Sequence, residues 1–409
     1  MDTINTGDNA FLILSAALVM LMTPGLALFY GGMVRAKNVL GTLMQSFFIV
    51  AVVSIIWAVA GYSLAFGPDV GGVIGNLAWL GLNGVGQEPF KDYAPTVPHL
   101  SFMVFQAMFA IITPALITGA FAERMKFSAF LIFTIAWSLL VYSPVAHWVW
   151  GLGGWIRGLG ALDFAGGTVV HINAAAAALA AALVIGKRQG LGSPDLSPHN
   201  LPMTMLGAAL LWFGWFGFNA GSALSAGGLA ASAFAVTHLA AAAATVSWIV
   251  VEWLHRGKPT TLGAASGGVA GLVAITPASG YVEPMPAIII GLLAGAICYG
   301  AVLLKWRLGY DDSLDAVGVH GAGGITGALC TGLFASLAVN SAGANGLFNG
   351  NPGLVLTQLL AVLATLVYSF GASYLILRLV DATVGLRLEP DEETTGLDLS
   401  QHSESAYDI

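Results

Sequence analysis

The chain has 409 residues, of which 57% are hydrophobic and only 9% are charged, and its mean hydropathy is +0.82. Soluble domains carry about 25% charged residues, so this composition excludes a soluble globular protein and indicates a polytopic membrane protein. The net charge of -7 argues against nucleic acid as a partner, and Cys298 and Cys330 lie inside apolar runs and predict no disulfide framework.

Uncharged runs follow one another along the whole chain, at residues 9–34, 38–68, 93–122, 127–156, 164–186, 196–251, 259–282, 284–304 and 316–377. A helix that spans a bilayer needs about 20 residues. The two longest runs therefore predict two helices each, with turns at 219–222 and 340–353, and every other run predicts one. The sequence thus predicts an all-α membrane protein with about eleven transmembrane helices.

The first ten residues carry Asp2 and Asp8 but no Lys or Arg. A secretory signal peptide starts with a positively charged region, so the first apolar run is expected to remain as a membrane helix. An odd number of helices places the two termini on opposite sides of the membrane. With the N-terminus outside, all but two of the 14 Lys and Arg residues fall on the cytoplasmic side, as the positive-inside rule requires. The two exceptions are Lys91 and Arg157.

Residues 1–380 are predicted to form the transmembrane domain. A linker at 189–200 divides it into two halves of five helices, about 9–188 and 200–338, and an eleventh helix follows at about 353–380. Since five is odd, the second half is expected to be inverted relative to the first, as in many transporters. The acidic segment 381–409 cannot bury enough apolar surface to fold alone. It is interpreted either as a solvated cytoplasmic tail or as a regulatory docking segment.

Two histidines stand in similar apolar settings. The stretch Asp163–His171 reads Asp-Phe-Ala-Gly-Gly-Thr-Val-Val-His, and Asp315–His320 reads Asp-Ala-Val-Gly-Val-His. A lone histidine in a membrane helix is most simply a core residue that bonds a backbone carbonyl. A charge at the centre of a membrane helix costs roughly 2.5 kcal/mol or more, so two deep histidines favour a shared pore site. No Cys or carboxylate lies at helical spacing from either, so no metal site is expected.

Asp163 and Asp315 each precede an apolar helical run, and both are predicted to cap a helix N-terminus. Aromatic residues recur at helical spacing, as in Phe105 with Phe109 and Trp215 with Phe218. Several Trp residues also gather where the fourth helix meets the outer surface. An interfacial aromatic belt explains such residues without any function, whereas rings that face inward attract a cation. Spacing alone leaves both interpretations open.

Several long motifs occur in a fixed order. They are Pro-Gly-Leu-Ala-Leu-Phe-Tyr-Gly-Gly at 24–32, Glu-Arg-Met-Lys-Phe-Ser at 123–128, the Asp163 stretch through Asn173, Gly-Trp-Phe-Gly-Phe-Asn-Ala-Gly-Ser at 214–222, Gly-Val-His-Gly at 318–321, and Gly-Leu-Asp-Leu with Ala-Tyr in the tail. Together they resemble the ammonium transporter family, in the ammonium branch of the Amt/Mep/Rh superfamily. The likeness covers nearly the whole chain.

The resemblance implies a homotrimer of eleven-helix protomers, each with its own pore, in the cell membrane (the inner membrane in a Gram-negative cell). It implies no enzyme activity and no cofactor, and it implies that a PII-type signalling protein docks at the cytoplasmic tail and loops. By motif position it assigns an outer cation site, a gate above the pore, pore-lining residues and supporting carboxylates. In this assignment the outer cation site consists of Phe105, Phe109, Trp150 and Ser222, and the gate consists of Phe109 and Phe218. The pore is lined by His171, His320, Trp215, Phe29 and Tyr30, and the supporting carboxylates are Asp163 and Asp315.

The expected function is ammonium uptake, in which ammonium is held at the outer aromatic site, loses a proton, and crosses the apolar pore as ammonia. Two alternatives remain open at this point. One is an ammonium sensor with little transport, although residues 381–409 are short for a signalling domain. The other is a channel for another small neutral molecule, as in the Rhesus relatives.

Overall fold

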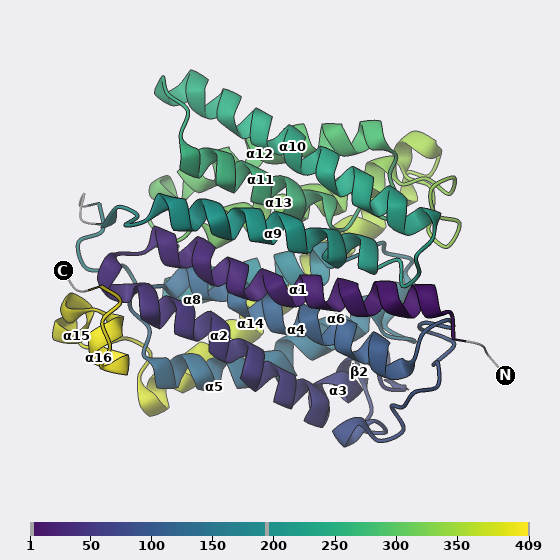
Figure 1. The fold of residues 1–409 in the computed structure, drawn as a ribbon, viewed down its shortest axis with the longest axis horizontal. Helices are drawn as coiled ribbons and strands as arrows, with labels where there is room; N and C mark the ends of the chain where they lie inside the picture. Colours follow the sequence, from purple (N-terminus) through teal and green to yellow (C-terminus); the bar gives the residue numbers. More distant parts are fainter. Residues whose placement is uncertain (1–3, 193–195, 408–409) are drawn as a thin grey trace.

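Long apolar helices lie side by side along the longest axis of the molecule, and the N- and C-termini lie at opposite ends (Figure 1). The computed structural model describes residues 4–192 and 196–407. The end that carries the C-terminus is called the tail end below, and the other is called the N-terminal end. Opposite termini agree with an odd number of membrane crossings.

The first half of the chain contributes five apolar helical spans, three of which include a π-helical stretch. Their parts are α1 (Thr6–Met33); α2 (Val39–Ile56), a π-helical stretch (Trp57–Gly61) and α3 (Tyr62–Phe66); α4 (His99–Phe121); α5 (Phe127–Trp137), a π-helical stretch (Ser138–Tyr142) and α6 (Ser143–Trp150); and a π-helical stretch (Gly167–Ile172) with α8 (Asn173–Ile185). The short strands β1 (Asp69–Val70) and β2 (Ile74–Gly75) form a hairpin after α3, and the short helix α7 (Trp155–Gly158) follows α6.

The second half repeats this plan and is followed by a long last helix and the tail. Its elements are α9 (Leu201–Gly221), α10 (Gly228–Arg256), α11 (Thr261–Ile275), α12 (Pro284–Leu308), a π-helical stretch (Val317–Gly321) with α13 (Ala322–Phe334), α14 (Gly353–Val384), α15 (Pro390–Thr395) and α16 (Leu397–His402).

The predicted all-α membrane architecture is confirmed. Within the described residues, ten helical spans are long and apolar enough to cross a bilayer, and α11 is a shorter apolar helix of 15 residues. The helix expected over 259–282 therefore ends early, at Ile275. Pro277 lies just beyond this end, and proline lacks the backbone N–H that a continuing helix would use. The run 196–251 divides slightly later than expected, between α9 and α10.

The helices of the two halves pack in corresponding pairs. In the first half α4 contacts α1, α2 and α8, and in the second half α11 contacts α9, α10 and α13. The first helices of the two halves, α1 and α9, pack along each other, and α13 contacts the π-helical stretch before α8. This correspondence supports two five-helix repeats that share a central interface, with α14 outside the repeat.

The interface between α1 and α9 depends on glycine. A Cβ atom added to Gly207 would lie 2.2 Å from the backbone nitrogen of Phe29 and 2.6 Å from the carbonyl oxygen of Gly25. Small residues allow helix backbones to approach closely in membranes. Gly207 therefore sets the distance between the two halves at the level of Phe29.

The interpretation of residues 381–409 as a solvated tail is wrong for residues 390–402, which fold into α15 and α16. In Figure 1, α15 and α16 lie together against the tail end of the bundle. The carboxylate of Asp398 accepts a hydrogen bond from the backbone N–H of Gly41 at 2.8 Å, and Asn38 accepts one from the N–H of Leu397 at 2.9 Å. Asp398 and Leu397 are each only 2% exposed. The tail folds because the bundle supplies the polar partners and the apolar surface that the tail lacks.

One buried and one partly buried ion pair join the loops at the tail end. The guanidinium of Arg188 bonds both carboxylate oxygens of Asp311, at 2.9 and 3.0 Å, and Arg35 pairs with Glu123 at 3.0 Å. Burial alone would raise the pKa of Asp311, but the hydrogen bonds and charges of Arg188, together with Arg124, hold this pKa below its ordinary value. The loops that carry these residues are thereby fixed to one another.

Candidate functional site

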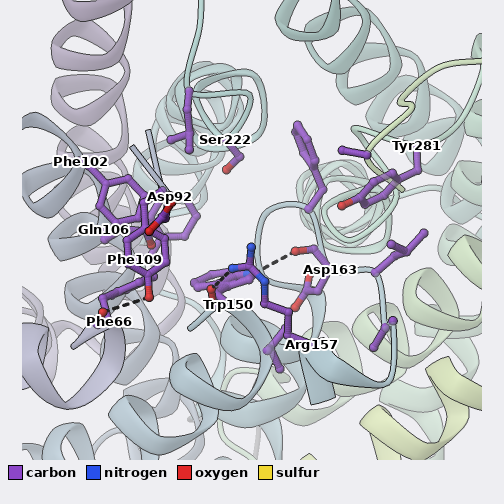
Figure 2. Close-up of a pocket in the computed structure, with 18 residues that line it drawn as sticks. Phe66, Asp92, Phe102, Gln106, Phe109, Trp150, Arg157, Asp163, Ser222 and Tyr281 are labelled. Carbon is purple, nitrogen blue, oxygen red and sulfur yellow. Dashed lines mark hydrogen bonds between the residues drawn. The ribbon is translucent and has the colours of Figure 1, made fainter. Parts of the chain in front are cut away.

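A vestibule of about 490 Å³ opens into the bundle among residues of the predicted outer site (Figure 2). Four of the predicted residues line it: Phe109 from α4, Trp150 at the end of α6, Asp163 before the π-helical stretch, and Ser222 just after α9. These side chains come from both halves of the chain, so the vestibule depends on the packing of the two repeats.

The walls of the vestibule are aromatic and are fixed by hydrogen bonds. The rings of Phe109 and Trp150 meet edge to face at 5.8 Å, and the Trp150 indole N–H donates to the backbone carbonyl of Asp163 at 2.8 Å. The hydroxyl of Ser222 donates its proton to the carbonyl of Phe218 at 2.8 Å. The oxygen of Ser222 is therefore left with lone pairs that can accept a hydrogen bond from a ligand.

Phe105 lies behind this wall. Its ring contacts that of Phe109 at 5.0 Å, edge to face, but Phe105 is fully buried and does not line the vestibule. It supports the ring of Phe109 from the side away from the cavity.

The buried carboxylate of Asp163 caps the π-helical stretch Gly167–Ile172, in line with its predicted role. Its oxygens accept hydrogen bonds from the backbone N–H groups of residues 166, 167, 168 and 169 at 2.6 to 3.1 Å. Every one of these bonds runs to the backbone that leads into His171. Asp163 therefore fixes the start of the helix that carries this histidine, while its edge borders the vestibule.

Two stacked phenyl rings separate the vestibule from a second cavity. The centroids of Phe109 and Phe218 are 4.3 Å apart and their planes are inclined by 28°. Phe109 borders the vestibule, and Phe218 borders the cavity beyond it. Both rings are almost completely buried, so nothing can pass between the two spaces unless a ring moves.

The second cavity is narrow and apolar. Its volume of about 10 Å³ corresponds to roughly one water-sized molecule. The lining consists of aliphatic and aromatic side chains and two imidazoles: Met22, Leu26, Phe29, Ile112, Leu116, Val170, His171, Leu211, Trp215, Phe218, Val269 and His320. A charged species would be costly to hold here, whereas a small neutral one would fit.

His171 and His320 face each other in this cavity. Their Nδ1 atoms are 3.2 Å apart and their rings are nearly parallel, at 12°. A hydrogen bond needs one donor and one acceptor, so one Nδ1 carries the shared proton and the other is bare. When both rings are neutral, one Nε2 is then an acceptor and the other is a donor. The ring of Trp215 stacks on His171 at 5.3 Å, and its indole N–H donates to Thr276 at 2.8 Å.

The structure corrects the assignment of Asp315 as the counterpart of Asp163. Asp312 holds that place, since its carboxylate accepts the backbone N–H groups of Ala316 and Val317 at 3.1 and 2.7 Å. Asp315 instead forms an ion pair with the buried Lys305, and its backbone is left-handed with φ of 62°. Asp312 stands eight residues before His320, as Asp163 stands eight residues before His171. This equal spacing to the histidine could have identified Asp312 from the sequence.

Phe29 and Tyr30 separate in the structure. Phe29 lines the second cavity, with Met22 and Leu26 on the same face of α1. Tyr30 lines neither cavity, because its hydroxyl donates to the carbonyl of Leu116 at 3.0 Å and its ring is buried. The spacing of Met22, Leu26 and Phe29 by four and three residues marks one helix face and could have identified the first two in the sequence.

Loop residues in the vestibule were not identified from the sequence. They include Asp92 and Tyr93 from the segment before α4, Arg157 from α7 and Tyr281 from the turn after α11. Irregular segments have no periodicity that predicts the direction of a side chain, so only the folded chain brings these residues together.

A bundle of apolar membrane helices around an aromatic vestibule and a narrow, histidine-lined cavity is typical of a multi-pass membrane transport protein. The model of the Ammonium Transporter Family matches residues 10–407, and the chain belongs to this family. It is 57% identical to the ammonium transporter of Bacillus subtilis (strain 168), over 98% of each chain.

Solved structures agree with this assignment. The crystal structure of Candida albicans Mep2 superimposes with a TM-score of 0.90 at 36% sequence identity, covering 95% of this chain and 88% of that one. A structure described as a sensor Amt protein superimposes with a TM-score of 0.89 at 31% identity, covering 97% and 98%. The family, the fold and a location in the cell membrane therefore agree.

Proposed function

We propose that this protein takes up ammonium and conducts it across the membrane as ammonia. The observation that carries the proposal is the stacked pair Phe109 and Phe218, which stands between an aromatic, polar-edged vestibule and a narrow apolar cavity. The first space suits a cation and the second suits a neutral molecule. The proton must therefore leave the substrate where the two spaces meet.

The vestibule recruits ammonium in this mechanism. The faces of Phe109 and Trp150 attract a cation through their ring quadrupoles, and the free lone pairs of Ser222 accept a hydrogen bond from its N–H groups. Potassium has a similar size and charge, so attraction alone does not distinguish it. Ammonium differs because it can release a proton and continue as ammonia.

Ammonia then crosses past His171 and His320, and the released proton travels separately along the histidine pair. The bare Nε2 of one ring accepts a hydrogen bond from ammonia and the protonated Nε2 of the other donates one. Within the described residues the Nε2 atom of His171 has no hydrogen-bond partner, which leaves it available to a passing molecule. Potassium has no neutral form and is excluded by the cost of burying its charge.

The test is a current measurement on purified protein reconstituted in vesicles, with matched pulses of ammonium chloride and potassium chloride. We expect a current with ammonium and none with potassium. His171→Ala should reduce the ammonium current at least tenfold or admit potassium, whereas unchanged flux and selectivity in this variant would remove the histidines from the mechanism. Ammonium and potassium currents of equal size in the unsubstituted protein would contradict deprotonation.

We place the vestibule outside the cell and the tail inside, because this orientation puts nearly all Lys and Arg residues on the cytoplasmic side. Cysteine substitution tests it. The native cysteines are buried, so a membrane-impermeant thiol reagent should label intact cells carrying exposed Leu80→Cys and leave exposed Lys258→Cys unlabelled. The reverse pattern would invert the orientation.

We also propose that copies of the protein associate through the face formed by α9 and α10. His238 is exposed about 15 Å along α10 from its start, and the rings of Phe216 and Phe234 stack beside it at 4.0 Å. An ionisable side chain at this depth is costly against lipid, so a second protein surface is its expected cover. The mass of the complex in detergent should correspond to three protomers, and a monomer would contradict this.

A sensor is the second candidate, favoured by the likeness to the sensor Amt protein. The discriminating measurement is the internal pH of the same vesicles after an ammonium pulse. No current and no internal pH change would favour a sensor that binds ammonium without transport. A pH change without current would instead favour a Rhesus-like neutral channel. A PII-type partner would act through the folded tail, and ammonium currents with and without such a protein would test that.

A further inference from the structure

Arg157 places a positive charge in the wall of the vestibule. It lies in the short helix α7, it lines the cavity, and it is exposed. In Figure 2 its side chain reaches from the ribbon toward Trp150, on the wall that also holds Asp163. The guanidinium donates a hydrogen bond to the backbone carbonyl of Trp150 at 2.5 Å. This bond holds the charge beside the aromatic ring that borders the cation site.

No carboxylate neutralises this charge within the described parts of the chain, where Arg157 forms no ion pair. The oxygens of Asp163 are directed to four backbone N–H groups. Asp92 lines the same vestibule and carries the opposite charge. The potential felt by a cation that enters is therefore set by at least three fixed charges, two negative and one positive.

We propose that Arg157 sets the affinity of this protein for its cationic substrate by repelling cations from the vestibule. The inference rests on the proposed function, because it assigns an electrostatic role within the ammonium path. A guanidinium that faces water raises the energy of a nearby monovalent cation, and this effect depends on charge and not on the shape of the cation. Salt screens it over about 10 Å at 0.1 M ionic strength.

Two expected results distinguish this electrostatic role from a purely structural one, in which the hydrogen bond of Arg157 only holds Trp150 in place. This structural alternative is called the brace below. Removing the charge should change the apparent affinity for ammonium and methylammonium by the same factor, since both carry one positive charge. The maximal current should not change, because the rings and histidines beyond the vestibule are untouched. A brace would act differently, since a displaced Trp150 would alter the ring contact with Phe109 and lower the maximal current.

The experiment measures the current of the reconstituted full-length protein against ammonium concentration, at low and at high concentrations of an impermeant salt. We expect Arg157→Gln to lower the half-saturating concentration by about threefold at low salt, and we expect the shift to shrink at high salt. Arg157→Lys retains the charge and should behave like the unsubstituted protein. Asp92→Asn should raise the half-saturating concentration, and the double variant should fall between the two.

Lys91→Gln is the matched control, because it removes the same charge from the same side of the membrane without altering the vestibule lining. An unchanged half-saturating concentration in Arg157→Gln, or an equal shift in Lys91→Gln, would overturn the inference. A reduced maximal current with unchanged affinity would assign Arg157 to the brace instead. Absence of ammonium current in the unsubstituted protein would contradict the proposed function itself, so the two failures are distinct. If Arg157→Gln does not fold, Arg157→Met, which also removes the charge, is measured in its place, with the same expected and contradicting results.

Discussion

Two buried carboxylates, Asp163 and Asp312, each hold the first turn of a helix that carries one of the two paired histidines. Both stand eight residues before the histidine, and both accept backbone N–H groups. The stretches Asp163–His171 and Asp315–His320 both begin with Asp and have Gly three residues later, and this similarity pointed to Asp315 instead of Asp312. The physical requirement is a carboxylate at the right distance from the histidine, and Asp312 meets it.

The number of backbone donors predicts how much each carboxylate contributes to stability. Asp163→Ala would leave four buried N–H groups unpaired and Asp312→Ala would leave two, and each unpaired group costs about 1–3 kcal/mol. Thermal unfolding in detergent should show a larger loss for Asp163→Ala than for Asp312→Ala. Asp92→Ala, at an exposed position, is the control and should change little. The reverse order would contradict this account of the caps.

At the scale of the helix, the narrow second cavity depends on how closely α1 approaches α9. Gly207→Ala would place a Cβ atom 2.2 Å from the backbone of Phe29, and backbone cannot move aside as a flexible side chain does. We expect a lower unfolding temperature and a reduced ammonium current, since Phe29 lines the cavity. Gly300→Ala in α12 is the matched control, because nothing lies within 4 Å of its added Cβ. Equal behaviour of the two variants would contradict the close-packing argument.

Element boundaries show what the apolar runs could and could not predict. Run length correctly separated α9 from α10 and α13 from α14, because these runs exceed one bilayer crossing. It overextended α11 past Ile275, because the residues beyond Pro277 are buried in an apolar turn that has the composition of a helix. The π-helical stretch around each histidine had no signature in the sequence either.

At the scale of the whole molecule, the buried ion pair at the tail end predicts a loss of stability in acid. The folded-state pKa of Asp311 lies below its ordinary value of 3.8, so its contribution is fully present above pH 3.8 and is lost as pH falls through the lower folded value. Asp311→Asn would break the two-bond pair and leave Arg188 with only the carboxylate of Glu123, 3.5 Å away. We therefore expect a loss of about 3 kcal/mol at neutral pH, the lower end of the range for breaking a buried pair.

Scanning fluorimetry of the detergent-solubilised protein from pH 7 to pH 3 checks this. The unsubstituted protein should lose stability at the acid end, and Asp311→Asn should start lower and show a smaller acid loss. The difference in stability between the two proteins should therefore stay constant above pH 3.8 and narrow below it. A difference that does not narrow below pH 3.8 would show that the ion pair does not carry the pH dependence.

The overall plan of the molecule was predictable because bilayer thickness and loop charge constrain a membrane chain strongly. The packing of the tail was not. Leu397 and Asp398 form hydrogen bonds with Asn38 and Gly41, which lie near the other end of the sequence. No local sequence pattern predicts contacts between residues so far apart in the chain. The same holds for the vestibule, whose loop residues meet only after the two halves have packed.

The division of the two cavities between the two halves of the chain has a consequence for synthesis. Phe109 and His171 leave the ribosome well before Phe218 and His320. A nascent chain that has inserted only its first five helices has neither the stacked rings nor the paired imidazoles, and α9 has not yet covered α1. The proposed path for ammonia and protons would thus be completed only after the tenth helix is in place, so on this proposal an interrupted translation product could not leak either species through it.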